Sequence, residues 1–330
     1  MKKLYKSVKI AVGALFLSAL VVSCLPEQES MGDAGQTLIK VSPADFSLLA
    51  LDAKSVAQSG SLFEVRRDVN SEAALASATT VVLEYDVSGA ILDKYNEVNE
   101  TSFVPLPETL GTTSPSVTGG KVVLEFGAGE FSKSVMLNVP NASAFDFTQQ
   151  YAFAFRLTEV TGTGTKSAAV NDTIIAQVLV KNKYDGKYVV TALSPMVDIL
   201  AATLTGWYPF TYELETSGEH SVMCLLTDPA YYNYYHPITS AGSYSVYGQF
   251  GIELFFDPSG NGKIIAVSNP WGNPPSLTRM PVIDPSGVNA WDPATRNITF
   301  KYWMKQPSLV PDAPNIRTSF DEVWTYKGSR

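Results

Sequence analysis

The sequence is poor in cysteine and histidine, with two residues of each among 330. The two histidines, His220 and His236, lack the short spacing of zinc ligands, and no serine or cysteine nucleophile can be assigned to either. Cys224 lies in the apolar stretch Ser221–Leu226, where a buried and unreactive thiol is expected. These scarcities remove the usual signatures of nucleophilic and metal catalysis. We therefore expect neither a metal site nor a cofactor.

A surplus of positive charge is also missing. The chain has 24 lysines and arginines against 32 aspartates and glutamates. Residues 24–330 hold only 20 of the basic residues and all 32 acidic ones, which gives them a net charge of −12. An acidic surface repels nucleic acid, and no glycine-rich phosphate loop leads into a helix. We therefore expect no nucleic-acid partner.

Long apolar runs are absent except for one near the N-terminus. Residues 10–22 form an apolar segment of 13 residues, shorter than the roughly 20 that a membrane-spanning helix needs. Four lysines precede this segment, and Ser23-Cys24 follows it. The order predicts a lipoprotein signal peptide over residues 1–23, acylation of Cys24 and an acidic tether over residues 24–38. We expect a surface-exposed outer-membrane lipoprotein held by its lipid anchor. The alternative is an ordinary cleaved signal with an incidental cysteine.

Residues 39–182 have the pattern of an all-β domain. Short runs rich in β-branched residues, such as Lys121–Phe126, are separated by turn residues, and only residues 71–78 and 90–96 favour short helices. The expected strands are 62–69, 80–85, 121–126, 134–139, 151–157 and 173–180. Six or seven strands over this length are typical of an immunoglobulin-like sandwich, although the Cys–Trp–Cys signature of that fold is missing.

Residues 183–330 form a second predicted β domain with a different composition. This part of the chain contains all five tryptophans and 12 of the 16 tyrosines. The expected strands are 186–192, 210–216, 220–226, 244–247, 251–256, 263–268, 298–305 and 321–326. Consecutive hairpins of this kind predict an antiparallel meander, which closes either as a lipocalin-like barrel or as a second sandwich.

Four short motifs follow one another along the mature chain. They are Asp93–Asn96 followed by Leu106-Pro107, Phe126–Gly129 ahead of the strand 134–139, and Tyr184–Tyr188 at the domain junction. Together with the lipobox and the acidic tether, they resemble surface lipoproteins of Bacteroidetes that accompany outer-membrane glycan-import machinery. In some members a related N-terminal domain precedes an endo-β-N-acetylglucosaminidase domain. The resemblance implies glycan capture at the cell surface, with importer proteins as partners.

A catalytic function has little support in the sequence. Glycosidases need two carboxyls that span the scissile bond, and the Asp-x-x-Asp-x-Asp-x-Glu motif of chitinase-like endoglycosidases is missing. The nearest acid pair, Glu213 and Glu215, is expected to be an exposed strand face. The segment Asp257–Ile264 has the alternating oxygens of a calcium loop but lacks the closing acid, so a hairpin turn is expected there. We expect no enzymatic activity.

Aromatic residues in loops are the strongest functional clue. Sugar-binding sites stack the apolar faces of sugars on aromatic rings and add a few polar groups. The predicted glycan-binding residues are Trp271, Trp291, Tyr231, Tyr234 and Tyr235, with Asn273 and Asp292 as polar neighbours. The alternative is that these rings pack against the end of the domain.

Three hypotheses of function therefore stand. The first is a non-catalytic, surface-anchored glycan-binding protein. The second is a structural or adhesion lipoprotein that binds protein partners. The third is a glycoside hydrolase of an unfamiliar type.

Overall fold

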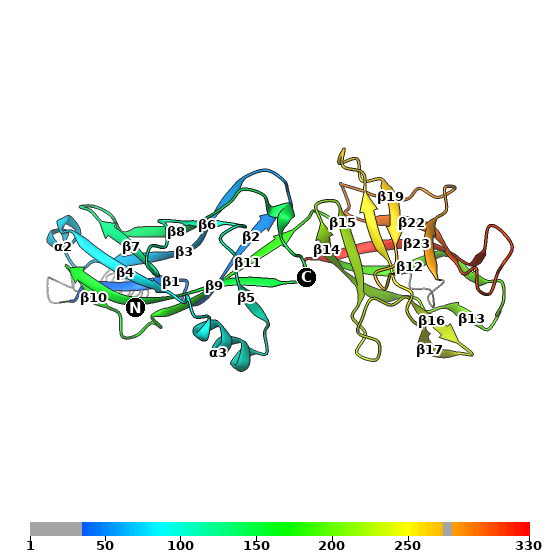
Figure 1. The fold of residues 1–330 in the computed structure, drawn as a ribbon, viewed down its shortest axis with the longest axis horizontal. Coiled ribbons are helices and arrows are strands. Elements are labelled where there is room, and N and C mark those ends of the chain that lie inside the picture. Colours follow the sequence, from blue (N-terminus) through cyan, green and yellow to red (C-terminus); the bar gives the residue numbers. More distant parts are fainter. Residues whose placement is uncertain (1–34, 273–278) are drawn as a thin grey trace, which may run out of the picture.

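The computed structural model describes residues 35–272 and 279–330, which form two β regions placed end to end (Figure 1). We call residues 35–181 the sandwich region and residues 182–330 the barrel region. The predicted all-β fold is confirmed, since strands make up most of both regions. The predicted signal peptide, Cys24 and Asn273 lie outside the described residues. Within the described residues no helix is long and apolar enough to cross a membrane.

The sandwich region consists of two facing sheets, as predicted. The strands of the first sheet are, in order, β10 (Thr165–Lys166), β1 (Leu38–Ser42), β3 (Gln58–Asp68), β8 (Ser132–Val139) and β6 (Thr112–Ser114). Those of the second sheet are β2 (Asp45–Asp52), β11 (Thr173–Lys181), β9 (Gln150–Gly162), β4 (Thr79–Tyr85) and β7 (Lys121–Phe126), and β5 (Phe103–Pro105) pairs with β9. Alternation along the strands creates the core, because Val122, Leu124 and Phe126 of β7 are buried while the residues between them are exposed.

Short helices cover two places on this sandwich. The helix α2 (Glu72–Ala76) begins at Ser71, whose hydroxyl accepts a hydrogen bond from the Ala74 amide. The helix α3 (Ala90–Asn99) buries Leu92 in a small second core on the outer face of the second sheet, with Phe103 and Ile175. A 3-10 turn, η1 (Ala142–Ala144), precedes the segment that leads into β9.

The barrel region is built on one long antiparallel sheet. Its strands are, in order, β19 (Ile264–Ser268), β18 (Glu253–Phe256), β15 (Ser221–Leu226), β14 (Phe210–Gly218), β12 (Gly186–Asp198), β23 (Ile316–Gly328), β22 (Ile298–Lys305) and β20 (Met280–Ile283), and β21 (Ala290–Trp291) pairs with β22. The two end strands, β19 and β20, lie beside each other, so the sheet curls into a nearly closed barrel. Of the two predicted alternatives, the barrel is therefore the observed one.

A second, small sheet accompanies the barrel. It contains β13 (Leu204–Gly206), β16 (Pro237–Ser240) and β17 (Ser243–Val246), and it lies at the lower right in Figure 1. The barrel interior is aromatic, with Tyr212, Tyr302 and Trp324 fully buried. Cys224 is buried in the same core, as predicted, and burial raises the pKa of its thiol well above the usual value.

The segment Asp257–Ile264 joins β18 to β19, where a hairpin turn was expected. The Asp257 carboxylate accepts hydrogen bonds from the Ser259 amide (2.8 Å) and from the Asn261 side chain (3.1 Å). These bonds within the turn hold the acid against its own loop and account for the oxygen-rich pattern of the sequence.

Candidate functional site

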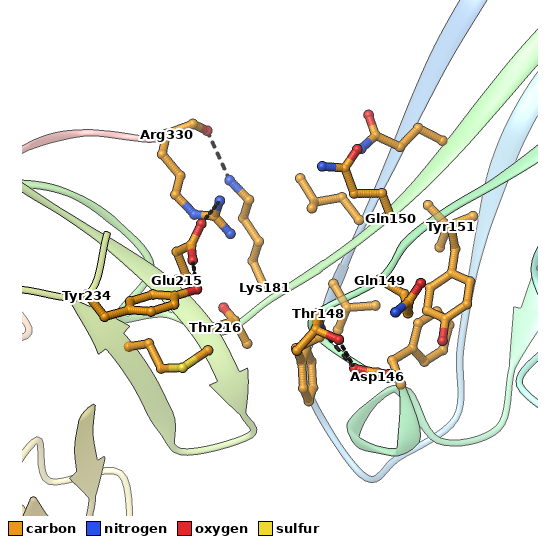
Figure 2. A pocket seen from close by; sticks show the side chains of 17 residues that line it. Asp146, Thr148, Gln149, Gln150, Tyr151, Lys181, Glu215, Thr216, Tyr234 and Arg330 are labelled. Carbon is orange, nitrogen blue, oxygen red and sulfur yellow. Dashed lines mark hydrogen bonds and ion pairs between the residues drawn. The ribbon is translucent and has the colours of Figure 1, made fainter. Parts of the chain in front are cut away.

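A polar cleft of about 440 Å³ lies where the two regions meet (Figure 2). One wall comes from the segment after η1 and from β9 and β11 of the sandwich region. The other comes from β14, β15, the loop after β15 and the last residue of the barrel region. The lining residues are Phe145, Asp146, Phe147, Thr148, Gln149, Gln150, Tyr151, Gln177, Val178, Leu179, Val180, Lys181, Glu215, Thr216, Met223, Tyr234 and Arg330.

The sandwich wall is shaped by a turn over residues 145–149. The Asp146 carboxylate accepts hydrogen bonds from the Thr148 hydroxyl (2.6 Å) and the Thr148 amide (3.0 Å), and these bonds lower the pKa of Asp146. Phe145 anchors the turn, since its buried ring packs edge-on against Tyr151 with 5.4 Å between centroids. The turn therefore presents Gln149 and Gln150 to the cleft.

The barrel wall is organised around Glu215, on the outward face of β14. The Tyr234 hydroxyl donates to Glu215 Oε2 at 2.7 Å, and Arg330 Nη1 lies 3.3 Å from Oε1. Burial, and then the Glu215 carboxylate, raise the pKa of Tyr234, so its hydroxyl keeps its proton. Glu213 and Glu215 were expected to form an exposed face of the strand, but their side chains are only about a quarter exposed. Glu213 also has a partner, since its Oε1 lies 2.9 Å from Lys187 Nζ.

A hydrogen bond between Lys181 and Arg330 connects the two walls of the cleft (Figure 2). Lys181 Nζ donates to the Arg330 carbonyl oxygen (3.0 Å), and Arg330 Nε donates to the buried Asp185 (3.1 Å). Asp185 also accepts hydrogen bonds from the amide and the hydroxyl of Thr216, at 3.1 and 3.0 Å. These contacts hold the segment between β11 and β12, which links the two regions, and so give the two walls fixed positions.

The free polar groups of the cleft are neutral amides. Within the described residues, the side-chain amides of Gln149, Gln150 and Gln177 make no hydrogen bond to the protein, and Gln149 and Gln150 are exposed. Each amide offers two donor hydrogens and an acceptor oxygen. No group of three or more His, Cys, Asp or Glu residues in the described ranges is arranged to hold a metal ion. The cleft therefore suits a neutral ligand with many hydroxyl groups.

Residues 52–164 match a known family of N-terminal domains. No curated protein matches the chain. A crystal structure of a protein of unknown function from Bacteroides ovatus is similar over 88% of this chain and 95% of that one, with 11% identity and a TM-score of 0.54. At this identity, the similarity shows a shared fold.

Two further solved structures come from Bacteroides thetaiotaomicron. An auxiliary nutrient binding protein is 12% identical over 84% of this chain and 90% of its own, with a TM-score of 0.43. A protein with a bound Man5GlcNAc product is 16% identical over 41% of this chain and 28% of its own, with a TM-score of 0.27.

Three of the residues predicted to bind glycan lie together at the barrel side of the cleft. Tyr234 lines the cleft directly. The Trp271 indole donates from Nε1 to the Tyr234 carbonyl oxygen (2.7 Å) and stacks on Tyr235, with 5.1 Å between centroids and 14° between the rings. The pair therefore supports the backbone that carries Tyr234.

The other predicted residues lie elsewhere. Trp291 is only 6% exposed and packs edge-on against Tyr184 in the barrel core, so it has no free face for a sugar. Its strand β21 pairs with β22, and this pairing turns the ring inward. Asp292 accepts hydrogen bonds from Ala294 and Thr295 in a turn and does not line the cleft. Tyr231 contacts Tyr244 instead.

Sequence reasoning missed most of the cleft. Gln149, Gln150, Gln177 and Arg330 belong to segments that are far apart in the chain, and none stands in a motif. The only local signal was the run of tyrosines that contains Tyr234.

Proposed function

We propose that this protein is a non-catalytic glycan-binding lipoprotein and that the cleft between its two regions holds the glycan. The observation that carries the proposal is the set of unpaired glutamine amides facing a fixed Tyr234–Glu215–Arg330 group. Sugar hydroxyls both donate and accept hydrogen bonds, as amides do. Phe147 and Tyr151 add apolar surface to the same wall.

The ligand class is a neutral oligosaccharide or polysaccharide. A net charge of −12 over residues 24–330 repels sulfated and uronic-acid-rich chains. The two acids of the cleft, Asp146 and Glu215, lie among donors from the protein itself. A hydroxyl that approaches Glu215 meets an acceptor whose position is already set by Tyr234 and Arg330.

A binding function without catalysis agrees with the state of these two carboxylates. Both oxygens of Glu215 are engaged, and Oδ1 of Asp146 is occupied by Thr148. A glycosidase needs one acid that can release a proton to the leaving oxygen and a second carboxylate across the bond. An acylated Cys24 would hold the protein at a membrane, and we propose that this is the outer face of the outer membrane, beside an importer.

The first experiment is affinity electrophoresis of residues 25–330 through gels that contain galactomannan, xyloglucan, xylan, yeast mannan or mucin. We expect retardation by at least one neutral polysaccharide. The double variant Gln149→Ala/Gln150→Ala should weaken that binding by about tenfold, since it removes two hydrogen-bonding groups. The matched control is Gln36→Ala, an exposed amide in the sandwich region that does not line the cleft.

Two outcomes would overturn this proposal. One is an absence of retardation across the whole panel. The other is release of shorter sugars from any panel polysaccharide, with loss of that release in Glu215→Gln, which would make the cleft catalytic.

The anchor is tested separately. Mass spectrometry of the N-terminal peptide of the membrane-extracted protein should find Cys24 acylated, and externally added protease should digest the protein on intact cells. An unmodified Cys24 thiol, or full protection from the protease, would contradict this part of the proposal.

A further inference from the structure

The barrel region carries a second cluster of aromatic rings outside the cleft. We propose that Trp207, Tyr231 and Tyr244, which we call the aromatic platform, bind a second sugar residue of the same glycan chain. This inference rests on the proposed function and extends it, because it makes the ligand an extended chain that is recognised along its length.

The three rings of the platform contact one another. The Trp207 and Tyr244 centroids are 4.7 Å apart with 43° between the rings, and the Tyr231 and Tyr244 centroids are 5.1 Å apart with 74° between the rings. Trp207 is 39% exposed, and it is the only exposed tryptophan of the five, all of which the structure describes. A partly exposed indole that packs with two further rings offers an apolar face on which a ligand can stack.

The platform is assembled from three separate segments. Trp207 directly follows β13, Tyr244 belongs to β17, and Tyr231 comes from the loop after β15. Tyr244 is held in the small sheet beside the barrel, because β17 pairs with β16. Trp207 is the first residue after β13 of the same sheet, and the Tyr231 amide is bonded to the backbone of Asp228 within its loop.

Asp228, in the loop that carries Tyr231, places a carboxylate beside the rings. Burial and the nearby Asp228 raise the pKa of Tyr244 to about 12. The backbone of Asp228 accepts a hydrogen bond from the Tyr231 amide (3.0 Å), and its side chain accepts one from the Ala230 amide (2.9 Å). Ring faces beside a fixed carboxylate match a sugar, which has an apolar face and a rim of hydroxyl donors.

One loop joins the platform to the cleft. Tyr231 belongs to the platform and Tyr234 lines the cleft, and their Cα atoms, three positions apart in the chain, lie about 11 Å apart at most. Between them, Tyr232 is 64% exposed. On this proposal, a sugar chain that fills the cleft continues past this loop to the platform, so that a longer chain makes contacts that a shorter one cannot make.

The test is isothermal titration calorimetry of residues 25–330 with cello-, xylo- and manno-oligosaccharides of increasing length. For the series that binds, we expect the affinity of the wild-type protein to rise with chain length. The variant Trp207→Ala should lose this gain, with about tenfold weaker binding of the longest ligand and unchanged binding of the shortest. Trp207→Phe, which keeps a ring, should recover part of it.

The outcomes separate this inference from the proposed function. If Gln149→Ala/Gln150→Ala weakens all lengths while Trp207→Ala keeps the full gain with length, the platform is wrong and the cleft stands. If no oligosaccharide or panel polysaccharide binds the wild-type protein, the proposed function itself fails. Capture of a protein partner that depends on Trp207, with sugar binding unchanged, would also overturn the platform.

A second measurement does not depend on affinity. Stacking of a sugar on the exposed Trp207 should change the tryptophan emission of the wild-type protein on titration with the longest ligand. The change should be much smaller in Trp207→Phe. An equal change in both proteins would show that the ligand contacts a different tryptophan and would overturn the inference.

Discussion

The two β regions bury polar groups in opposite ways. The sandwich core is mainly aliphatic, and its notable buried charge, Arg67, donates to the backbone carbonyls of Leu75, Ser77, Gly127 and Glu130. The barrel core is rich in tyrosine and tryptophan, whose polar ends need partners inside the protein. The comparison shows that tyrosine and tryptophan side chains carry hydrogen-bonding groups into the barrel core. In the mainly aliphatic sandwich core, the buried guanidinium of Arg67 lies near the end of β3.

The partner in the barrel is one buried carboxylate. Glu322 is fully buried and accepts hydrogen bonds from Trp324 Nε1 (2.9 Å), from the Tyr302 hydroxyl (3.2 Å) and from Tyr208, and it lies 3.0 Å from His236 Nε2. Burial, and then the Glu322 charge, raise the pKa of Tyr302 well above its usual value. A charge without these donors would be too costly to bury, so the rings and the acid depend on one another.

Removal of the Glu322 carboxylate is expected to have the largest effect on stability. Glu322→Ala leaves buried donors without an acceptor and should destabilise the barrel region by about 4 kcal/mol. Denaturation followed by tryptophan fluorescence reports on this region alone, because all five tryptophans lie in it. The matched control is Asp321→Ala, the neighbouring and only partly buried acid of β23, which should cost under about 1 kcal/mol. Equal losses in both variants would contradict the role of Glu322.

The sandwich counterpart is Arg67. The variant Arg67→Met leaves the four carbonyls without their donor and should cost about 3 kcal/mol. Because the sandwich region has no tryptophan, hydrogen exchange of the amides in β4 and β9 is the suitable measurement. The control Arg66→Met, at the exposed neighbouring position of β3, should change little. Faster exchange throughout the barrel region as well would show that the two cores are not independent.

The sequence predicted the elements whose pattern is local. The run Lys121–Phe126 is β7 as expected, and Ile298–Lys305 is β22, because each alternates buried and accessible residues over its whole length. Strands of two or three residues, such as β10 and β13, were missed, because so short a run shows no period in its hydrophobic pattern. The long strand β12 was predicted only as far as residue 192, and its bulged continuation opposite β23 is set by pairing.

The candidate site was much less predictable than the fold. The argument from loop position selected Tyr234, which lines the cleft. The same argument selected Trp291, which the pairing of β21 with β22 turns into the core. Trp207 was passed over, although it proved to be the exposed tryptophan. Which face of a ring is covered depends on partners distant in the chain, and a single sequence does not give those partners.

A smaller effect is expected where the two regions meet. Arg330→Gln removes the contacts of the guanidinium with Asp185 and Glu215, so the barrel wall of the cleft loses a fixed point. We expect about threefold weaker binding of the panel polysaccharide that retards the wild-type protein. The stability loss should be under about 1 kcal/mol, because the Arg330 side chain is partly exposed and the buried Asp185 keeps Lys181 and both Thr216 donors. The control is Lys327→Gln, an exposed residue of β23 that does not line the cleft. A larger loss of stability than of affinity would assign Arg330 to the fold rather than to the site.

The smallest expected effect is that of acid pH on two similar turns, one in each region. Asp146 and Asp292 each accept a threonine hydroxyl and a backbone amide, and these bonds lower the pKa of both carboxyls. Because the native pKa is lowered, each turn is fully stabilised above the ordinary value of about 3.9 and loses that stabilisation as the pH falls through the native value. Acidification to about pH 5 should therefore leave both turns and the glycan affinity unchanged.

Carboxyl carbon NMR titration can then separate the two turns. Asp146 lies in the cleft wall and Asp292 does not, so a bound polysaccharide from the panel should alter the titration of Asp146 alone. Thr148→Ala removes the largest cause of the shift and should raise the pKa of Asp146 toward its ordinary value while Asp292 stays unchanged. If the ligand alters Asp292 instead, the glycan binds at the turn after β21, and the cleft is not the site.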